Sequence, residues 1–432
     1  MKMANMDDYF DVVIVGTGAA GLYCALNLPA RYRILLLTKQ KADESDSFLA
    51  QGGICMQHGE ADYRPFFDDT MRAGHYENNP ATVDLMIRSS NSIIRDLVRR
   101  GVRFARDDHG ALRFTREGAH SRPRILFHED ITGHEITQTL LNEVLRCENI
   151  ELREHMTLLD FFADASACGG VIAADPDGEP RAIGAGAVVL ACGGIGGLYK
   201  NSTNFPHITG DAIAMALRHG VACEHLDYIQ IHPTTLYSHR KGRRFLISES
   251  VRGEGALLLD KNGNRFTNEL QPRDVVSAAI RAQMEKDGTD HVWEDMRPIG
   301  EAAIREHFPN ILERCEEEGY DPIHEPIPVV PAQHYFMGGI TVDLSSRTAL
   351  PRLYACGETC CNGVHGRNRL ASNSLLESLV FAQRAADDIL YGEPPVFTGD
   401  KPDLAPYREQ EPLFAAYRQE VLTAIERSKN HE

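Results

Sequence analysis

Short apolar runs separated by glycines mark the beginning of the chain. Residues 11–15, rich in β-branched side chains, predict a buried parallel strand, and Ile34–Leu37 predict a second one. Residues 22–28 between them are compatible with a helix. The turn between the first strand and this helix reads Gly16-Thr17-Gly18-Ala19-Ala20-Gly21. This places a G-x-G-x-x-G pattern inside a βαβ unit and predicts a dinucleotide-binding site.

The glycines of this turn have separate functions in such a site. Gly16 permits the tight turn, Gly18 lets the backbone approach a pyrophosphate, and Gly21 allows the helix to pack on the strand. The helix N-terminus then offers free N–H groups and a positive dipole end to the phosphates. The second strand ends in Thr38-Lys39 where an NAD site would have an acidic ribose ligand. Lys39 is therefore either a solvated strand end or a residue near the adenosine half of a flavin.

Later apolar runs return to the same nucleotide from distant parts of the chain. Residues 187–192 and 352–358 predict strands that run into glycines, and residues 373–391 predict a helix. Between them lies a polar segment rich in Arg and Glu, with an Asn262-Gly263 turn. We therefore expect an α/β fold in which a Rossmann-like domain is interrupted by a smaller α+β capping domain. The expected boundaries are 1–225 and 336–392 for the nucleotide domain, 226–335 for the cap, and 393–432 for a Pro394-Pro395 loop and an amphipathic helix over about 407–428.

Charge and cysteine content narrow the class of protein. The chain of 432 residues carries 45 Lys and Arg against 62 Asp and Glu, a net charge of −17, which argues against nonspecific binding to nucleic acid or anionic membranes. The ten cysteines are dispersed, and although Cys356, Cys360 and Cys361 are close together, their spacing does not match a zinc site, so no metal is expected. Reduced thiols and the lack of a membrane-length apolar run or secretory signal lead us to expect a soluble, cytoplasmic protein.

Several further motifs, in one order along residues 9–391, make a resemblance specific. They are the glycine turn, Ala50-Gln51-Gly52-Gly53, His232-Pro233-Thr234, Arg252-Gly253-Glu254-Gly255, Pro272-Arg273-Asp274, His334-Tyr335, Gly338-Gly339, Gly357-Glu358, Asn368-Arg369 and Ser372-Asn373-Ser374-Leu375. Together they resemble the flavoprotein family of succinate dehydrogenase, fumarate reductase and L-aspartate oxidase. The resemblance implies an FAD cofactor and a C4 dicarboxylate substrate.

Two positions distinguish between members of this family. The membrane-complex enzymes usually carry a flavin-linked His five residues before the Gln of A-Q-G-G, and here that residue is Asp46, so the resemblance implies noncovalent FAD. The segment Thr115–Ser121, T-R-E-G-A-H-S, is similar to that of L-aspartate oxidase, and fumarate-type enzymes tend to have an aromatic residue in place of Glu117. A carboxylate there is favourable if the substrate brings a cation, such as the α-ammonium of aspartate. The alternative is that Glu117 is an exposed loop charge paired with Arg116.

The substrate site needs cations, because a dicarboxylate carries two negative charges. The resemblance places Arg369, His232, His334 and Arg273 around the substrate, and Arg369 can bind one carboxylate through its planar fork. Arg273 is implied as the proton-transfer residue, although an arginine is a poor base and could instead only bind a carboxylate. Ser248 and Glu249 are similar to the family's hydroxyl and acid beside this site.

The resemblance also assigns residues to FAD. The ring is expected across Ala50, Gln51, Gly52 and Gly53, preceded by Asp46 and Ser47. Glu358 is the implied ribityl ligand, Asp211 a flavin contact, and Ser374-Leu375 the helix N-terminal donors, although Ser374 could also be a simple helix cap.

The expected activity is FAD-dependent oxidation of L-aspartate to iminoaspartate, the first step of NAD biosynthesis through quinolinate. Oxygen or fumarate would reoxidise the flavin, and functional coupling to quinolinate synthase is implied. One alternative is a soluble fumarate reductase or succinate dehydrogenase type of flavoprotein, and another is a flavin-binding protein without turnover. The C-terminal helical domain of the family is expected to be reduced or absent, because only 57 residues (432 − 375) follow Leu375.

Overall fold

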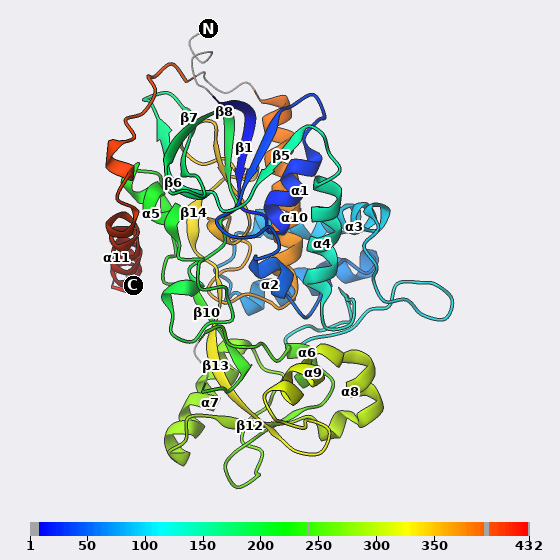
Figure 1. Ribbon diagram of the computed structural model, residues 1–432. Coiled ribbons are helices and arrows are strands. Elements are labelled where there is room, and N and C mark those ends of the chain that lie inside the picture. Colours follow the sequence, from blue (N-terminus) through cyan, green and yellow to red (C-terminus); the bar gives the residue numbers. More distant parts are fainter. Residues whose placement is uncertain (1–7, 240–241, 393–396, 431–432) are drawn as a thin grey trace.

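A twisted sheet forms the centre of the larger half of the molecule. The computed structural model describes residues 8–239, 242–392 and 397–430 (Figure 1). The strand order is β5-β2-β1-β8-β7-β6, and β15 also pairs with β8. The strands are β1 (Tyr9–Val15), β2 (Ile34–Leu37), β5 (Ile150–Arg153), β6 (Thr157–Ala163), β7 (Cys168–Ala174), β8 (Pro180–Leu190) and β15 (Leu353–Ala355). Strands β1, β2, β5, β8 and β15 pair in parallel, whereas β6, β7 and β8 form an antiparallel meander.

Helices cover both faces of this sheet because its parallel strands are apolar on both sides. In β1, Val12 and Ile14 belong to one hydrophobic core, and Val13 and Val15 belong to the other. The first core is completed by α1 (Ala19–Asn27), α3 (Pro80–Arg100), α4 (Thr132–Val144) and α10 (Asn373–Tyr391), and the second by α5 (Asp211–Arg218) and α11 (Gln410–Lys429). Helix α2 (Tyr63–Ala73) and the short pairs β3 (Ile54–Cys55) with β4 (Ile125–Leu126), and β14 (Gly339–Thr341) with β9 (Cys223–Glu224) and β16 (Cys360–Cys361), lie around this body.

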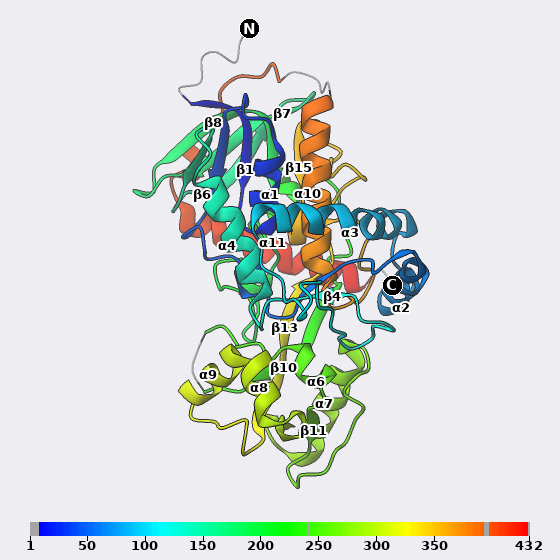
Figure 2. The same ribbon diagram turned by 90° about the vertical axis from the view of Figure 1, so that its right-hand side faces the viewer.

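A smaller lobe with its own core lies at one end of this body (Figures 1 and 2). Its antiparallel sheet has the order β10-β13-β12-β11. The strands are β10 (Ile229–Leu236), β11 (Leu257–Leu259), β12 (Val292–Asp295) and β13 (Ile327–Phe336), and the helices are α6 (Glu249–Gly253), α7 (Arg273–Asp287), α8 (Glu301–His307) and α9 (Pro309–Glu317). We call this lobe the cap. The domain boundaries at 225 and 335 stay predictions.

The mixed α/β class is as expected, but several elements differ from their predicted extents. Strand β8 is longer than the predicted 187–192 because its first residues pair with β7 of the meander. Strand β15 is shorter than the predicted 352–358, since the chain turns at Gly357, where φ is +66°. The predicted C-terminal helix is α11, which buries Tyr417, Val421 and Ile425 along one face. The predicted Pro394-Pro395 loop lies outside the described residues.

Two further features concern the helices and the cysteines. No helix in the described ranges combines the length and the apolar character needed to cross a membrane. All ten cysteines are free thiols.

Candidate active site

One cavity runs between the sheet and the cap and brings together nearly every predicted site residue. It is lined by the predicted residues Gly16, Thr17, Gly18, Ala20, Lys39, Asp46, Ser47, Ala50, Gln51, Gly52, Gly53, Glu117, Asp211, His232, Ser248, Glu249, Arg273, His334, Glu358, Arg369, Ser374 and Leu375. Ala19 and Gly21 do not line it. The sequence separations show that the fold, and not local order along the chain, assembles this cavity.

The glycine turn has the geometry that a bound pyrophosphate requires. Gly16 has a φ of +115°, and a Cβ there would lie 2.0 Å from the Ala191 carbonyl oxygen. A Cβ on Gly21 would lie 2.0 Å from the Gly16 carbonyl oxygen, so Gly21 packs the helix on the turn itself. The N–H of Ala19 donates to Ser47 Oγ at 3.0 Å, which brings this serine to the positive end of α1.

The strand-end lysine pairs with another predicted cofactor residue. Lys39 Nζ donates to Asp211 Oδ2 at 2.8 Å and to the His207 carbonyl at 3.2 Å. Asp211 opens α5 and also accepts a hydrogen bond from Thr209 Oγ1. Lys39 Nζ lies 4.9 Å from the centre of the Phe414 ring, which belongs to α11. Lys39 is therefore ion-paired just beyond β2, and its assignment to the adenosine half of the cofactor stays a prediction.

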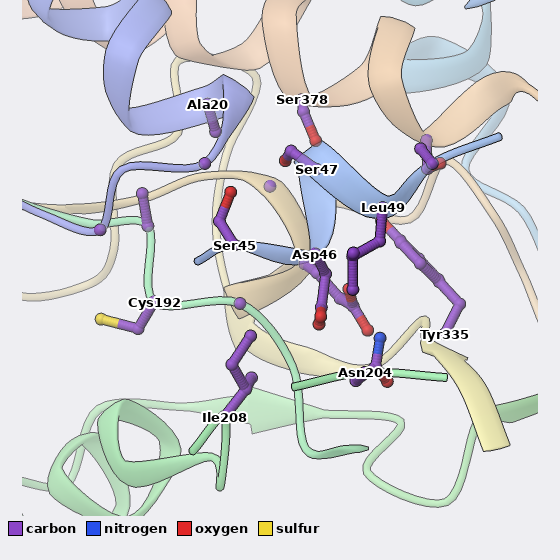
Figure 3. Close-up of a pocket in the computed structure, with 18 of the residues that line it drawn as sticks. Ala20, Ser45, Asp46, Ser47, Leu49, Cys192, Asn204, Ile208, Tyr335 and Ser378 are labelled. Atoms are coloured by element: carbon purple, nitrogen blue, oxygen red, sulfur yellow. The ribbon is translucent and has the colours of Figure 1, made fainter. Parts of the chain in front are cut away.

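Polar side chains, among them Ser45 and Asp46, line the cavity (Figure 3). Ser45 Oγ, Asp46 Oδ2 and Gln51 Oε1 are buried and have no hydrogen-bond partner within the described part of the chain. Asp46 Oδ1 accepts from the Phe205 N–H at 2.9 Å, and burial raises the pKa of Asp46 to about 7. Buried polar atoms are normally paired, so these atoms fit a polar ligand that completes their hydrogen bonds.

The remaining predicted cofactor residues line the same region. Glu358 Oε1 accepts from the Phe336 N–H at 2.9 Å, and burial raises the pKa of Glu358 well above its usual value. Ser374, in the first turn of α10, accepts a hydrogen bond from Arg369 Nη1 at 2.7 Å, so its hydroxyl is not a helix cap. The glycine turn, the α1 N-terminus, the unpaired polar atoms and the side-chain-free Gly52 and Gly53 together fit the phosphates, ribityl chain and ring of FAD.

Two arginines and two histidines meet at the cap end of the cavity. Gln230 Oε1 accepts from Arg273 Nη1 at 2.8 Å and from Arg369 Nε at 3.3 Å, so one amide holds both guanidinium groups. The rings of His232 and His334 are 5.1 Å apart in an edge-on arrangement. Burial, followed by the charge of Arg273, lowers the pKa of both histidines well below the ordinary value, so both imidazoles are neutral.

The local structure explains how these side chains are presented. His232 lies on β10 just before Pro233, where the register with β13 is irregular, and Arg273 is the first residue of α7 after Pro272. His334 Nδ1 contacts Thr203 Oγ1 at 2.7 Å, whereas His232 Nε2 has no partner among the described residues and lies at the cavity wall. His232 Nε2 is therefore available to a ligand.

Glu249 joins the arginines into a buried chain of charges. Its Oε2 accepts from Arg273 Nε at 2.6 Å and lies 3.9 Å from Arg252 Nη2. Burial alone would raise the pKa of Glu249, but Arg273 and Arg252 lower it below the usual value. Asp274 points away and pairs with His75 at 3.0 Å. Ser248 caps α6, where its Oγ accepts from the Ser250 N–H.

Glu117 is buried within this cationic region. Its side chain accepts from Ser250 Oγ at 2.9 Å and from Ser372 Oγ at 2.6 Å, and the residue is only 3% exposed. The alternative of an exposed loop charge paired with Arg116 is therefore wrong. Burial, followed by the charge of Glu249, raises the pKa of Glu117. Gln230 and Ser250 are site residues that the sequence does not reveal, and Arg252 and Ser372 are recognisable only as members of their motifs.

Known proteins of one family are similar to this chain over most of its length. The FAD binding domain family matches residues 11–375. The L-aspartate oxidase of Clostridium perfringens is 48% identical over 380 residues, which cover 88% of this chain and 86% of that protein. That of Clostridium acetobutylicum is 47% identical over 380 residues, covering 88% and 87%. That of Nostoc sp. is 44% identical over 442 residues, covering 98% and 76%.

Solved structures show the same architecture. A quinol-fumarate reductase with menaquinol molecules has a TM-score of 0.84 and 32% identity, covering 95% of this chain and 75% of that one. A mutant of E. coli quinol fumarate reductase has a TM-score of 0.82 and 30% identity, covering 95% and 74%. The two Clostridium relatives are similar in length to this chain, because the same 380 residues form 88% of this chain and 86% or 87% of those proteins.

Proposed function

The chain belongs to the L-aspartate oxidase family of FAD-binding flavoproteins, and we propose that it oxidises L-aspartate to iminoaspartate with noncovalently bound FAD. The observation that carries this proposal is the buried Glu117 carboxylate beside Arg273, Arg369 and two neutral histidines in one cavity. Aspartate matches this set, because it has two carboxylates and one ammonium group. Succinate and fumarate have no cation to pair with Glu117.

The cationic groups would bind the two carboxylates at separate places. Arg369 is held by Gln230 and Ser374, which leaves its remaining N–H groups for one carboxylate. His232 Nε2, which lacks a protein partner among the described residues, and His334 would hold the other. Asp46 stands where covalent enzymes have a linking histidine, so the proposal is for noncovalent FAD.

Arg273 would transfer the proton that leaves the substrate. Bound FAD supplies the two-electron acceptor for the oxidation. Arg273 Nε already donates to Glu249, so a proton can pass from Arg273 to this carboxylate, which would leave a neutral guanidine to take the proton from the substrate. Arg252, 3.9 Å from Glu249, stays a cation and orients the carboxylate. Despite burial, Arg273 and Arg252 lower the pKa of Glu249, so its carboxylate is ionised and holds no proton before the transfer.

The decisive experiment is anaerobic bleaching of the flavin with aspartate, succinate and buffer side by side. We expect the yellow protein to bleach with L-aspartate. Bleaching with succinate but not with aspartate would instead favour the soluble fumarate reductase or succinate dehydrogenase type. Bleaching with neither substrate would favour a flavin-binding protein without turnover. Oxygen uptake and fumarate reduction, measured on the same preparation, would identify which acceptor reoxidises the flavin.

The product suggests the setting in which the enzyme works. An imine is hydrolysed by water, so iminoaspartate must be consumed soon after release, and we propose functional coupling to quinolinate synthase in NAD biosynthesis. The free state of all ten cysteines supports a cytoplasmic location. Quinolinate synthase should form more quinolinate when it is mixed with this enzyme and aspartate than when it receives iminoaspartate that has been left to stand in water. Equal yields would contradict the coupling.

A further inference from the structure

Two serine hydroxyls from separate elements converge on Glu117. Ser250 of α6 donates to Oε1 at 2.9 Å, and Ser372, directly before α10, donates to Oε2 at 2.6 Å. Ser248 Oγ lies 3.3 Å from Ser250 Oγ, so a third hydroxyl adjoins the first. Both carboxylate oxygens therefore have a protein donor before any substrate is bound.

We propose that Ser250 and Ser372 form a hydroxyl clamp that keeps the Glu117 carboxylate charged and aimed into the cavity, and that this clamp selects substrates carrying an ammonium group. The inference deepens the proposed function, on which it rests. Ser250 and Ser372 are positioning residues, because they act through Glu117.

The surroundings of Glu117 explain why its charge needs this support. A buried carboxylate is costly unless hydrogen bonds or opposite charges compensate it. The ionisable groups that act on Glu117 are Glu249 of α6, which opposes its charge, Arg273 of α7, which favours it, and the buried Cys55 thiol of β3. His120, on the same loop, is neutral near physiological pH because burial lowers its pKa to about 4. Burial and Glu249 raise the pKa of Glu117, and the two hydroxyls oppose this increase as direct donors that favour the ionised carboxylate.

The backbone around the clamp indicates that its geometry is constrained. Ser372 has a φ of +61°, a left-handed conformation that is unfavourable for a residue with a side chain. Its carbonyl accepts from the Cys55 N–H at 3.0 Å, so both its backbone and its hydroxyl are engaged. A Cβ on Gly52 would lie 2.4 Å from Glu117 Oε1, which places the carboxylate against the predicted ring-binding segment. An ammonium bound by Glu117 would therefore lie close to the ring.

The test compares Ser250→Ala and Ser372→Ala with matched controls. Ser250→Thr keeps a hydroxyl at the first position. Ser346→Ala removes a hydroxyl from a buried serine that is also left-handed, with a φ of +60°, and that bonds the Phe381 carbonyl away from the cavity. In the FAD-loaded enzyme, KM and kcat are measured for aspartate oxidation and for fumarate reduction over about pH 6 to 9, together with thermal unfolding.

Each alanine variant of the clamp should raise the aspartate KM roughly ten-fold or more near neutral pH. This increase in KM should become smaller as the pH rises, because Glu117 then ionises without the missing hydroxyl. Fumarate kinetics should change little, since fumarate carries no ammonium. Ser250→Thr keeps the hydroxyl and should raise the aspartate KM less than Ser250→Ala does, whereas Ser346→Ala should behave like the parent enzyme. Equal losses for aspartate and fumarate, a loss independent of pH, or no loss at all would each overturn the clamp.

A second readout keeps the clamp separate from the proposed function. Infrared difference spectra report the carbonyl band of protonated Glu117, assigned by its disappearance in Glu117→Gln. The titration midpoint of this band should move to higher pH in both serine-to-alanine variants, whether or not aspartate is oxidised. An unmoved midpoint would refute the clamp even if aspartate is the substrate. A shifted midpoint without aspartate oxidation would refute the function alone.

Discussion

Replacing Glu117 by Gln tests the basis of substrate choice directly. Glutamine has nearly the same shape, and each serine hydroxyl can either donate or accept, so the contacts with Ser250 and Ser372 can persist. The substitution therefore removes the charge and preserves the packing of a residue that is only 3% exposed. Any selective loss reports the pairing of the carboxylate with the substrate ammonium.

The size of the effect follows from the type of bond that is lost. A hydrogen bond to a charged group contributes about 1.5–3 kcal/mol, which corresponds to a roughly 10- to 150-fold loss in kcat/KM for aspartate. Fumarate should be reduced as well as before or better, because Glu117 opposes its carboxylates. The assay is steady-state oxidation of aspartate beside reduction of fumarate by reduced viologen, with thermal unfolding to confirm an intact fold. Equal losses for both reactions would refute the ammonium contact.

The other predictions concern the proton route, the cofactor and stability. Glu249→Gln should lower kcat for aspartate roughly 100-fold with little change in KM, because Arg273 loses its 2.6 Å carboxylate partner. Steady-state kinetics measures both constants, and a change in KM alone would contradict this proton route. Lys39→Met should weaken FAD binding roughly three- to thirty-fold in a flavin fluorescence titration, because Asp211 loses its ion pair; unchanged affinity would contradict this. Burial raises the pKa of Glu294 from 4.5 to about 8, so the folded state keeps a proton that the unfolded chain loses, and stability falls as pH rises between these values. Glu294→Gln should therefore flatten the pH dependence of thermal unfolding and stabilise the protein above about pH 8, whereas an unchanged profile would refute the assignment.

The sequence predicts the buried parallel strands best. β2 has the predicted bounds and β1 starts two residues earlier, because uniformly apolar runs between glycines leave few alternatives. The meander strand β7 carries no comparable signal, since Gly169 and Gly170 interrupt its apolar pattern. The early start of β8 depends on pairing with β7, so local sequence could not reveal it.

Motif residues of the site are predictable for a similar reason, whereas their partners are not. Glycines and paired histidines in fixed order carry specific chemistry, and the cavity brings them together. Ser250 and Ser372 lie 133 and 255 residues away from Glu117 in sequence. Ser372 belongs to a motif, but nothing in the sequence pairs either serine with the Glu117 carboxylate. Gln230 is likewise visible only once the fold brings Arg273 and Arg369 to it.

The C-terminal helix shows how far the cofactor site depends on contacts outside its motifs. All motifs lie upstream of α11, so the sequence alone gives this helix no part in the site. In the fold, Phe414 of α11 lies over Lys39, and Val421 lies 3.6 Å from where a Cβ on Gly210 would be. Gly210 directly precedes Asp211, so α11 packs close to both partners of the Lys39–Asp211 ion pair. Helix α11, which lies beyond the matched residues 11–375, thus supports the Lys39–Asp211 pair. Substitutions in α11 should therefore change the affinity for FAD more than the preference for aspartate over fumarate.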